Sequence, residues 1–226
     1  MKILVTGGSG FIGRAVCALA VERGLTVTSL SRHGPSLPTH TPVLAKVSWL
    51  RGSVFDEQGL DAALQGVEAV VHCVGIGRER PSKDESFKRV NGDSAIVVGE
   101  AAKRAGVRAF VFLSAGEKPP WAHEEYLSSK RRAEVALAKI CERLVVLRPG
   151  LVYGPEKRLA TFAAGLLRAV ATVRTPGPRL EANTPVSAAT VARAVMRAVL
   201  DPNARGVVEP ARIAGFAEVA LAVTSL

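Results

Sequence analysis

Residues 6–13 read Thr6-Gly7-Gly8-Ser9-Gly10-Phe11-Ile12-Gly13, a glycine-rich turn between two apolar runs. The run before it, Lys2–Thr6, has the length of a buried strand, and Phe11–Arg23 has the recurrence of an amphipathic helix. Gly7 allows a tight turn, Gly10 allows the backbone to approach a pyrophosphate, and Gly13 allows the helix to pack closely on the sheet. This stretch therefore predicts a phosphate-binding turn that opens a β-α-β unit.

Strand and helix candidates alternate outward from this turn. The further strand candidates are Leu25–Leu30, Lys46–Leu50, Glu68–Val74, Val107–Leu113 and Arg143–Leu147. The helix candidates between them are Asp56–Gln65, Glu85–Ala105 and His123–Ile140. After Pro149 we expect helices over Lys157–Thr172 and Ala188–Leu200 and a short strand over Gly206–Glu209. The alternation predicts an α/β fold with a doubly wound parallel sheet in one domain, residues 1–226, whose part after about residue 150 forms a small substrate-side lobe.

Length and composition exclude several classes of protein. The chain has 226 residues, of which 48% are hydrophobic and 22% charged, as in ordinary globular proteins. Disorder, collagen and coiled coil are excluded. Its cysteines, Cys17, Cys73 and Cys141, are widely spaced without histidine partners, which indicates reduced thiols and predicts no metal site. No apolar run reaches about 18 residues, and Met1 leads straight into a strand, so we expect a cytoplasmic protein, or a mitochondrial matrix protein if a presequence was removed.

The net charge of +10 is concentrated in the C-terminal third. Within residues 157–197 the charged side chains are Lys157, Arg158, Arg168, Arg174, Arg179, Arg193 and Arg197 against Glu181 alone. Such a region is either a solvated basic face or an attraction for an anionic substrate, an acidic partner or a membrane surface. Nucleic-acid binding is not expected, because that function needs denser basic clusters with interleaved aromatic residues.

The end of the second strand predicts the cofactor. No acidic residue lies between Gly24 and Phe55, whereas an NAD enzyme places a carboxylate on the ribose at this point. The strand ends with Ser31 and Arg32, which suit a 2′-phosphate, and Arg14 is near enough to help. We therefore predict NADP (NADPH) as cofactor. The alternative is that Arg32 is an ordinary exposed loop charge.

A tyrosine and a lysine stand four residues apart in the predicted helix His123–Ile140. Tyr126 and Lys130 therefore share one helix face, where the ammonium would lower the pKa of the phenol toward neutrality. Ser114 follows the strand Val107–Leu113, at the edge where ligands bind, and its hydroxyl could hold a substrate oxygen. Val74 and Gly75 offer small side chains where a cofactor would pass.

With the motifs TGGSGFIG, LSAG, YLSSK and RPGLVYGP, the chain resembles the extended and atypical short-chain dehydrogenase/reductases over nearly its whole length. The resemblance implies a catalytic set of Ser114, Tyr126 and Lys130 and a nicotinamide bordered by Pro149 to Val152. It implies pyrophosphate contacts by Gly7, Ser9, Gly10, Phe11, Ile12 and Gly13. Where the family usually has an acidic residue against adenine, this chain has Ser53, followed by Val54. Asn91 matches a family position that orders a helix.

The phrases SRHG, SSKRRAE, VVLRPG and TPVSAATVARAV are similar to a subgroup with the dehydrogenase-like accessory subunit of respiratory complex I and fungal ubiquinone-biosynthesis proteins. The resemblance implies an NADP(H)-dependent oxidoreductase acting on a small carbonyl or alcohol substrate, in quinone or isoprenoid-related metabolism. The alternative is an NADP(H)-binding accessory or redox-sensing protein of a respiratory or quinone-biosynthesis complex, without turnover.

One apolar stripe keeps two interpretations open for the substrate side. Its members fall at helical spacing: Leu159, Phe162, Ala163, Leu166, Leu167 and Val170. It is either core packing or, with its basic flanks, the mouth of a pocket for a long apolar molecule delivered from an anionic membrane surface. The oligomeric state stays open.

Overall fold

The computed structural model describes residues 1–34, 41–116, 123–155 and 185–218. Its centre is a seven-stranded sheet in the order β3-β2-β1-β4-β5-β6-β9, and every pair of neighbours is parallel. The strands are β1 (Lys2–Thr6), β2 (Thr26–Ser31), β3 (Ser48–Arg51), β4 (Ala69–His72), β5 (Ala109–Leu113), β6 (Leu144–Leu147) and β9 (Gly206–Val208). The order reverses between β1 and β4, the switch point beside which such sheets bind ligands.

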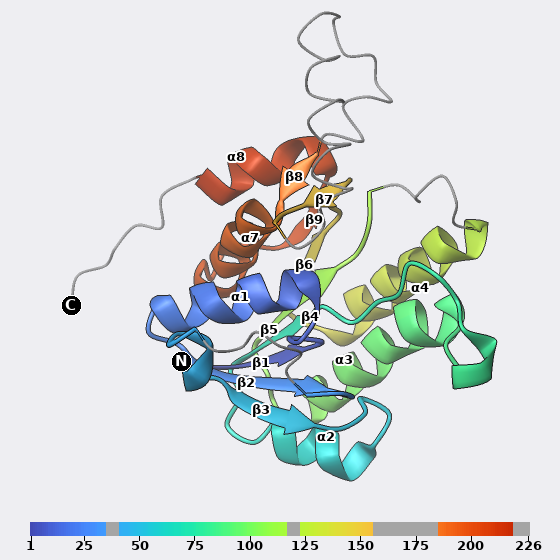
Figure 1. The fold of residues 1–226 in the computed structure, drawn as a ribbon, viewed down its shortest axis with the longest axis horizontal. Coiled ribbons are helices and arrows are strands. Elements are labelled where there is room, and N and C mark those ends of the chain that lie inside the picture. Colours follow the sequence, from blue (N-terminus) through green and yellow to red (C-terminus); the bar gives the residue numbers. More distant parts are fainter. Residues whose placement is uncertain (35–40, 117–122, 156–184, 219–226) are drawn as a thin grey trace, which may run out of the picture.

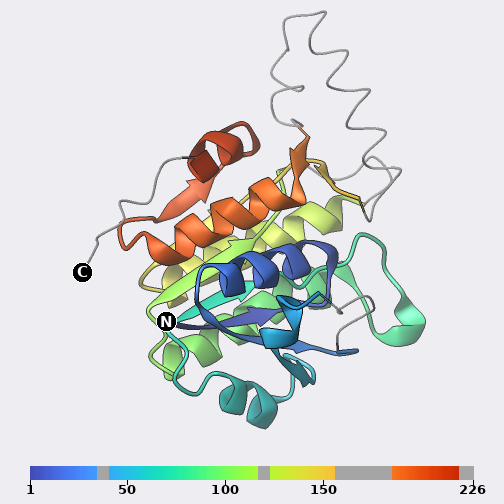
Figure 2. The ribbon, with the colours of Figure 1, turned by 60° about the vertical axis from the view of Figure 1, so that its left-hand side comes forward.

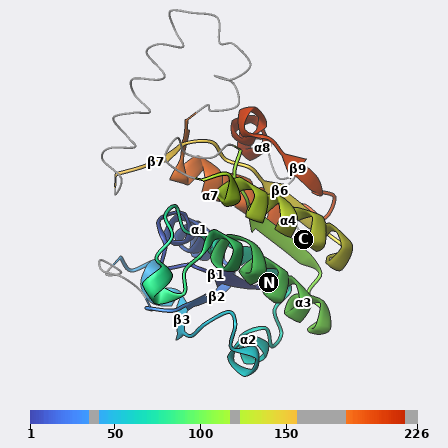
Figure 3. The same ribbon diagram turned by 90° about the vertical axis from the view of Figure 1, so that its right-hand side faces the viewer.

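Helices cover both faces of this sheet (Figure 1). They are α1 (Phe11–Glu22), α2 (Glu57–Ala63), α3 (Ser94–Arg104), α4 (Glu124–Ile140), α7 (Ala188–Leu200) and α8 (Ile213–Glu218). On one face, α1 and α7 lie side by side and share a core with β1, β5 and β6 (Figure 2). On the other, α2, α3 and α4 pack on alternate strand residues such as Phe110 and Phe112, with α3 beside α4 (Figure 3). The predicted doubly wound α/β fold is confirmed.

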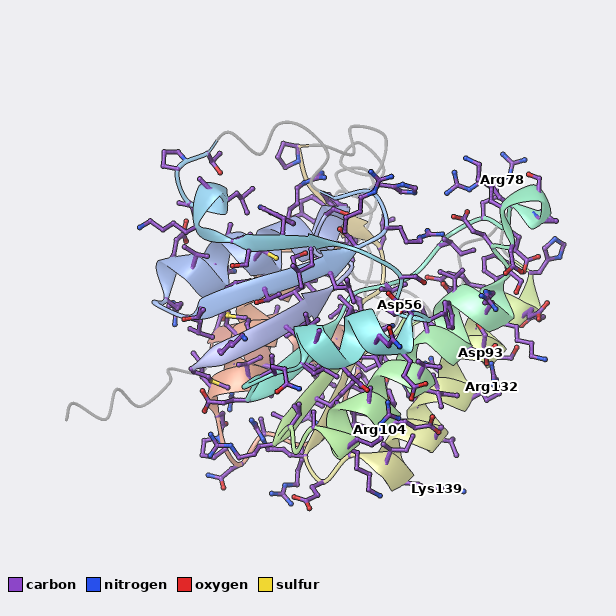
Figure 4. All side chains as sticks on the ribbon, turned by 90° about the horizontal axis from the view of Figure 1, so that it is seen from below. Asp56, Arg78, Asp93, Arg104, Arg132 and Lys139 are labelled. Atoms are coloured by element: carbon purple, nitrogen blue, oxygen red, sulfur yellow. The ribbon has the colours of Figure 1, made fainter. Side chains whose placement is uncertain are left out.

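The helix predicted over Glu85–Ala105 is present from Phe87 to Arg104, but it begins two residues later and its first part is a π-helix. Glu85 instead forms an antiparallel bridge with Arg80. A π-helix follows over Lys88–Asp93, and α3 begins at Ser94. A π-helix widens the turn by one residue, which apolar periodicity does not reveal, and such turns occur frequently at functional sites. Arg132 of α4 donates to Asp93 at 2.6 Å and ties α4 to this turn (Figure 4).

The chain after β6 pairs once more before the last helices. Strand β7 (Val152–Tyr153) lies parallel to β8 (Val186–Ser187), which leads directly into α7. The predicted helix over Ala188–Leu200 is confirmed to the residue. The predicted helix over Lys157–Thr172, its apolar stripe and most of the basic region lie outside the described residues.

A buried histidine links β1, β4 and α3 beneath the switch point. The Thr6 hydroxyl lies 2.8 Å from His72 Nδ1, and His72 Nε2 lies 3.1 Å from Ser94 Oγ. Ser94 donates its own proton to the carbonyl oxygen of Val90 at 2.6 Å, so Nε2 carries the hydrogen and Nδ1 accepts one from Thr6. Burial, followed by the charge of Lys130, lowers the pKa of His72 from 6.5 to about 3.

We expect His72 to make the protein sensitive to acid. Below pH 6.5 the unfolded chain binds a proton at this residue that the folded chain does not bind until about pH 3. The free energy of unfolding should therefore fall by up to about 1.4 kcal/mol per pH unit across that window. Urea unfolding at a series of pH values measures this slope. A His72→Gln variant should be less stable at pH 7 but show a shallower decline, and parallel curves would contradict the assignment.

Candidate functional site

A cavity of about 360 Å³ opens at the switch point, beside the carboxyl ends of β1, β2 and β4. Many predicted cofactor-binding residues line it: Gly7, Ser9, Gly10, Ser31, Arg32, Ser53, Val54, Val74 and Gly75. Cys73, His33 and Phe55 line it as well. Segments far apart in the sequence thus meet in one site, in which the glycine turn after β1 lies between the ends of β2 and β4.

The glycine turn has the shape that a pyrophosphate requires. Gly7 has φ +77°, a conformation that side chains rarely adopt. A methyl group at Gly13 would lie 2.3 Å from the carbonyl oxygen of Gly7, so only glycine allows α1 to begin this close to the turn. Arg14 donates to the carbonyl oxygen of Ser9 at 2.7 Å, which places this charge at the turn. The helix N-terminus adds a positive dipole end toward the cavity.

The β2 end of the cavity presents a polar atom that lacks a partner. Ser31 Oγ is buried and has no hydrogen-bond partner among the described residues, although Ser31 lines the cavity. Buried hydroxyls are almost always satisfied, and of the two serine hydroxyls without a partner in the described residues, those of Ser29 and Ser31, only that of Ser31 belongs to a residue lining the cavity. A ribose or phosphate oxygen would satisfy it, and the residues present therefore fit a dinucleotide.

The charge of Arg32 has a partner that the sequence reasoning missed. Its Nη1 lies 2.7 Å from Oε1 of Glu85, a residue 53 positions further along the chain. Glu85 is 3% exposed and also accepts from Arg80 Nε at 2.6 Å. Burial alone would raise the pKa of Glu85, but hydrogen bonds from Arg32 and Arg80 hold it below its usual value. Although no acidic residue is close to Arg32 in the sequence, the fold brings the carboxylate of Glu85 into contact with it.

Lys130, one of the predicted catalytic residues, lies next to the Gly75 end of this cavity. A methyl group at Gly75 would lie 3.6 Å from Lys130 Nζ and 3.3 Å from Asn91 Oδ1. Lys130 is buried and donates to the carbonyl oxygen of Leu113 at 2.9 Å. The ring of Tyr126 packs edge-on against Phe87, with centroids 5.5 Å apart. Lys130 thus lies next to the Gly75 end of the cavity, and Tyr126 precedes it by about one turn of the same helix.

The predicted lowering of the Tyr126 pKa is not what the structure shows. Burial raises the pKa of this phenol, because removal from water disfavours the charged form. Burial also lowers the pKa of Lys130 from 10.5 to about 8, and its ammonium points to a backbone carbonyl. Tyr126 is therefore a protonated phenol near neutral pH.

Asn91 holds the backbone at the centre of the site. Its Oδ1 accepts from the Ile76 amide at 2.7 Å, and its Nδ2 donates to the Ile76 carbonyl at 3.1 Å. The π-helix presents Asn91 at this point, fully buried, between Gly75 and Lys130. The structural role expected for Asn91 agrees with these contacts.

The sequence predicted that Ser114 would offer its hydroxyl to a substrate, but in the structure this hydroxyl is already hydrogen-bonded within the protein. It donates to the carboxylate of Glu134 on α4 and accepts from Arg131 Nη1 at 3.2 Å. Glu134 also accepts from Arg148 Nε at 3.1 Å, and Arg148 in turn binds Glu209 at 2.6 Å. The physical reason is strand alternation, since Ser114 continues the face of Phe110 and Phe112 toward α4. Its hydroxyl joins the end of β5 to α4 and β6.

The remaining predicted residues surround the site without lining the cavity. Pro149 accepts from the Gly116 amide at 2.8 Å, next to the end of β5. Val152 begins β7. A methyl group at Gly154, just after β7, would lie 2.9 Å from the ring of Phe11, so the start of α1 meets this part of the chain. Ile12 packs into the core between α1 and the sheet.

The described residues hold neither a candidate metal site nor a candidate membrane-spanning helix. No group of histidine, cysteine or acidic side chains in those ranges has the arrangement of a metal site. Within the same ranges, no helix combines the length and the apolar character that crossing a membrane requires.

The family follows from the pattern of residues 3–177, which matches the sequence model of the NAD-dependent epimerase/dehydratase family. The chain belongs to that family. The match spans the glycine turn, the cavity, Tyr126 and Lys130. Among solved structures, Thermus thermophilus UDP-glucose 4-epimerase in complex with NAD is 25% identical, with a TM-score of 0.68 over 95% of this chain and 74% of that one.

Relatives with similar sequences include both a reductase and a subunit of a respiratory complex. A ceramide reductase of Caulobacter vibrioides is 30% identical over 153 residues, which are 68% of this chain and 47% of the relative. The 40 kDa subunit of NADH-ubiquinone oxidoreductase from Neurospora crassa is 26% identical over 202 residues, 88% of this chain and 52% of the relative. The predicted likeness to the complex I subunit is confirmed. The chain spans about half the length of these two relatives.

Proposed function

We propose that this chain is an NADP(H)-dependent oxidoreductase that transfers a hydride between the nicotinamide and a carbonyl or alcohol carbon. The observation that carries the proposal is the β2 end of the cavity, where Arg32 stands beside the unpartnered hydroxyl of Ser31. A guanidinium and a hydroxyl suit the 2′-phosphate that distinguishes NADPH from NADH. Gly7, Ser9, Gly10 and Gly13 would hold the pyrophosphate, and Ser53 and Val54 the adenine side.

The buried phenol of Tyr126 supports carbonyl reduction as the favoured direction. The bound cofactor would supply the hydride. Tyr126 would donate its proton to the substrate oxygen, because its raised pKa keeps the phenol protonated near neutral pH. Lys130, with a pKa of about 8, holds a proton that can replace the one given up by the phenol. Ser114 enters this proposal as a support for the end of β5, through Glu134.

A long apolar carbonyl compound is the substrate class that we propose. The relative named ceramide reductase supports a lipid substrate, and a quinone precursor stays the alternative. Pro149 to Val152 would border the nicotinamide. A binding role without turnover, as an accessory protein of a respiratory or quinone-biosynthesis complex, is the second candidate function. The occupied hydroxyl of Ser114 and the complex I relative favour it.

NADPH should bind at least tenfold more tightly than NADH. One charge-assisted contact to the 2′-phosphate supplies a gap of about 1.4 kcal/mol. Fluorescence titration of both cofactors measures it, and Arg32→Ala should bring the two affinities together.

Arg80→Ala is the matched control, because Arg80 also binds Glu85 but does not line the cavity. That variant should keep the preference for NADPH. If both variants lose it equally, the effect comes from Glu85 rather than from a phosphate contact of Arg32. Equal affinities in the unmodified protein would refute the NADPH assignment.

A further inference from the structure

The connection between β4 and α3 forms a wall of the cavity that contacts Arg32 through Glu85. It leaves the sheet after Gly75, makes a short turn over Pro81–Lys83, and returns to the π-helix; Arg78 marks it in Figure 4. Backbone hydrogen bonds between Arg80 and Glu85, of 2.9 and 3.2 Å, close this turn. Lys83 and Asp84, at its tip, both line the cavity.

The charges on this wall are unequally satisfied. Of the cations that line the cavity in the described ranges, Arg32 pairs with Glu85, and Arg89 pairs with Asp84 at 3.0 Å while stacking on Phe55 at 4.3 Å. Lys83 has no carboxylate partner among the described residues. An exposed lysine alone indicates little, but this one lines the same cavity as Ser31, whose buried hydroxyl has no partner among the described residues. One bound anion would pair with the Lys83 ammonium and accept a hydrogen bond from the Ser31 hydroxyl.

Glu85 ties the two walls together. Its carboxylate is buried between Arg32, from the end of β2, and Arg80, from the base of the turn. Arg32 uses one nitrogen on Glu85, at 2.7 Å, and remains 45% exposed. A guanidinium offers five N–H donors, so its other edge remains open to a second anion. Holding Arg32 in one place in advance lowers the entropy cost of binding that anion.

We infer that the turn Pro81–Glu85 is the second wall of the 2′-phosphate site, with Lys83 contacting the phosphate and Glu85 positioning Arg32 and the turn. This inference rests on the proposed preference for NADPH and extends it to residues outside the β2 end. The phosphate would lie between a guanidinium from β2 and an ammonium from the β4–α3 connection. Ser31 would donate its free hydroxyl to the same group or to the adjoining ribose.

Two nucleotide fragments isolate this contact, because they differ only in the 2′-phosphate: adenosine 2′,5′-bisphosphate and adenosine 5′-monophosphate. Calorimetric titration of the full chain should show that Lys83→Ala weakens the bisphosphate about tenfold, the loss of one charge-assisted contact. Affinity for the monophosphate should stay unchanged. Lys88→Ala is the matched control, since Lys88 is exposed nearby but does not line the cavity, and both affinities should be kept.

Glu85→Ala tests the positioning role. It should lower the ratio of bisphosphate to monophosphate affinity, whereas a purely structural defect would weaken both ligands alike. If that variant does not fold, Lys83→Ala still decides the phosphate contact. A bisphosphate preference that survives Lys83→Ala unchanged would overturn the inference alone. Absence of any preference in the unmodified protein would instead overturn the proposed NADPH specificity on which it rests.

Discussion

Replacing Tyr126 by phenylalanine should lower turnover by about 10² to 10⁴, the range for loss of a positioned proton donor. The variant removes one oxygen and keeps the ring that packs against Phe87, so the fold and the cofactor cavity should persist. NADPH affinity should therefore remain nearly unchanged. Loss of NADPH absorbance with a panel of long-chain oxo compounds and quinones measures the rate.

The other tyrosine in the chain, Tyr153, supplies a matched control. Tyr153→Phe removes the same hydroxyl from β7, outside the proposed proton path, and should keep most of the turnover. Full turnover in the Tyr126 variant would place the proton donor elsewhere. If NADPH binds but neither the parent protein nor any variant turns over a substrate of the panel, the accessory binding role replaces the enzyme.

Glu134→Ala should cost about 3 kcal/mol of unfolding free energy. Removing one member of a buried ion cluster typically costs 3–5 kcal/mol, and the lower end applies because Arg131 and Arg148 keep some contact with water. The variant also leaves the Ser114 hydroxyl without its acceptor. Chemical denaturation followed by circular dichroism measures the loss. Lys139→Ala, an exposed change on the same helix, should alter stability by less than about 0.5 kcal/mol.

The Glu134 contribution should also depend on pH in a defined direction. Burial would raise its pKa, but hydrogen bonds from Arg148 and Ser114 and the charge of Arg131 bring it below the ordinary value. A carboxyl with a lowered folded pKa stabilises the fold above its unfolded pKa and loses that effect as pH falls through the folded one. The difference between the parent and Glu134→Ala should therefore shrink in acid. A difference that grows in acid would contradict the ion cluster.

Local sequence patterns predicted the sheet because each signal lies within a few residues. Strand β1 was predicted to the residue, as was α7, since apolar runs and caps act over one element. The order of the strands follows from the alternation of strand and helix, which forces parallel crossovers. The π-helix was not predicted, because the one extra residue in its turn does not change which residues are apolar.

The contacts of Arg32 and Ser114 were not predicted from the sequence, for two different reasons. The partner of Arg32 comes from Glu85, and nothing near either residue in the sequence announces an ion pair across the cavity. Ser114 is different, because a signal was available. Phe110 and Phe112 were visible as one face of a strand, and period-two alternation would have directed Ser114 to the same helix layer.

Because of the π-helix, the function of the site depends on the number of residues in the segment Lys88–Asp93. The π-helix holds one residue more than an ordinary helical turn, so deleting one residue within Lys88–Asp93 would let the chain close as an ordinary turn and would change the direction in which Asn91 points. Asn91 could then no longer reach both backbone groups of Ile76 while α3 kept its packing on the sheet. The site should tolerate many substitutions at exposed positions of this turn but no change in its residue count.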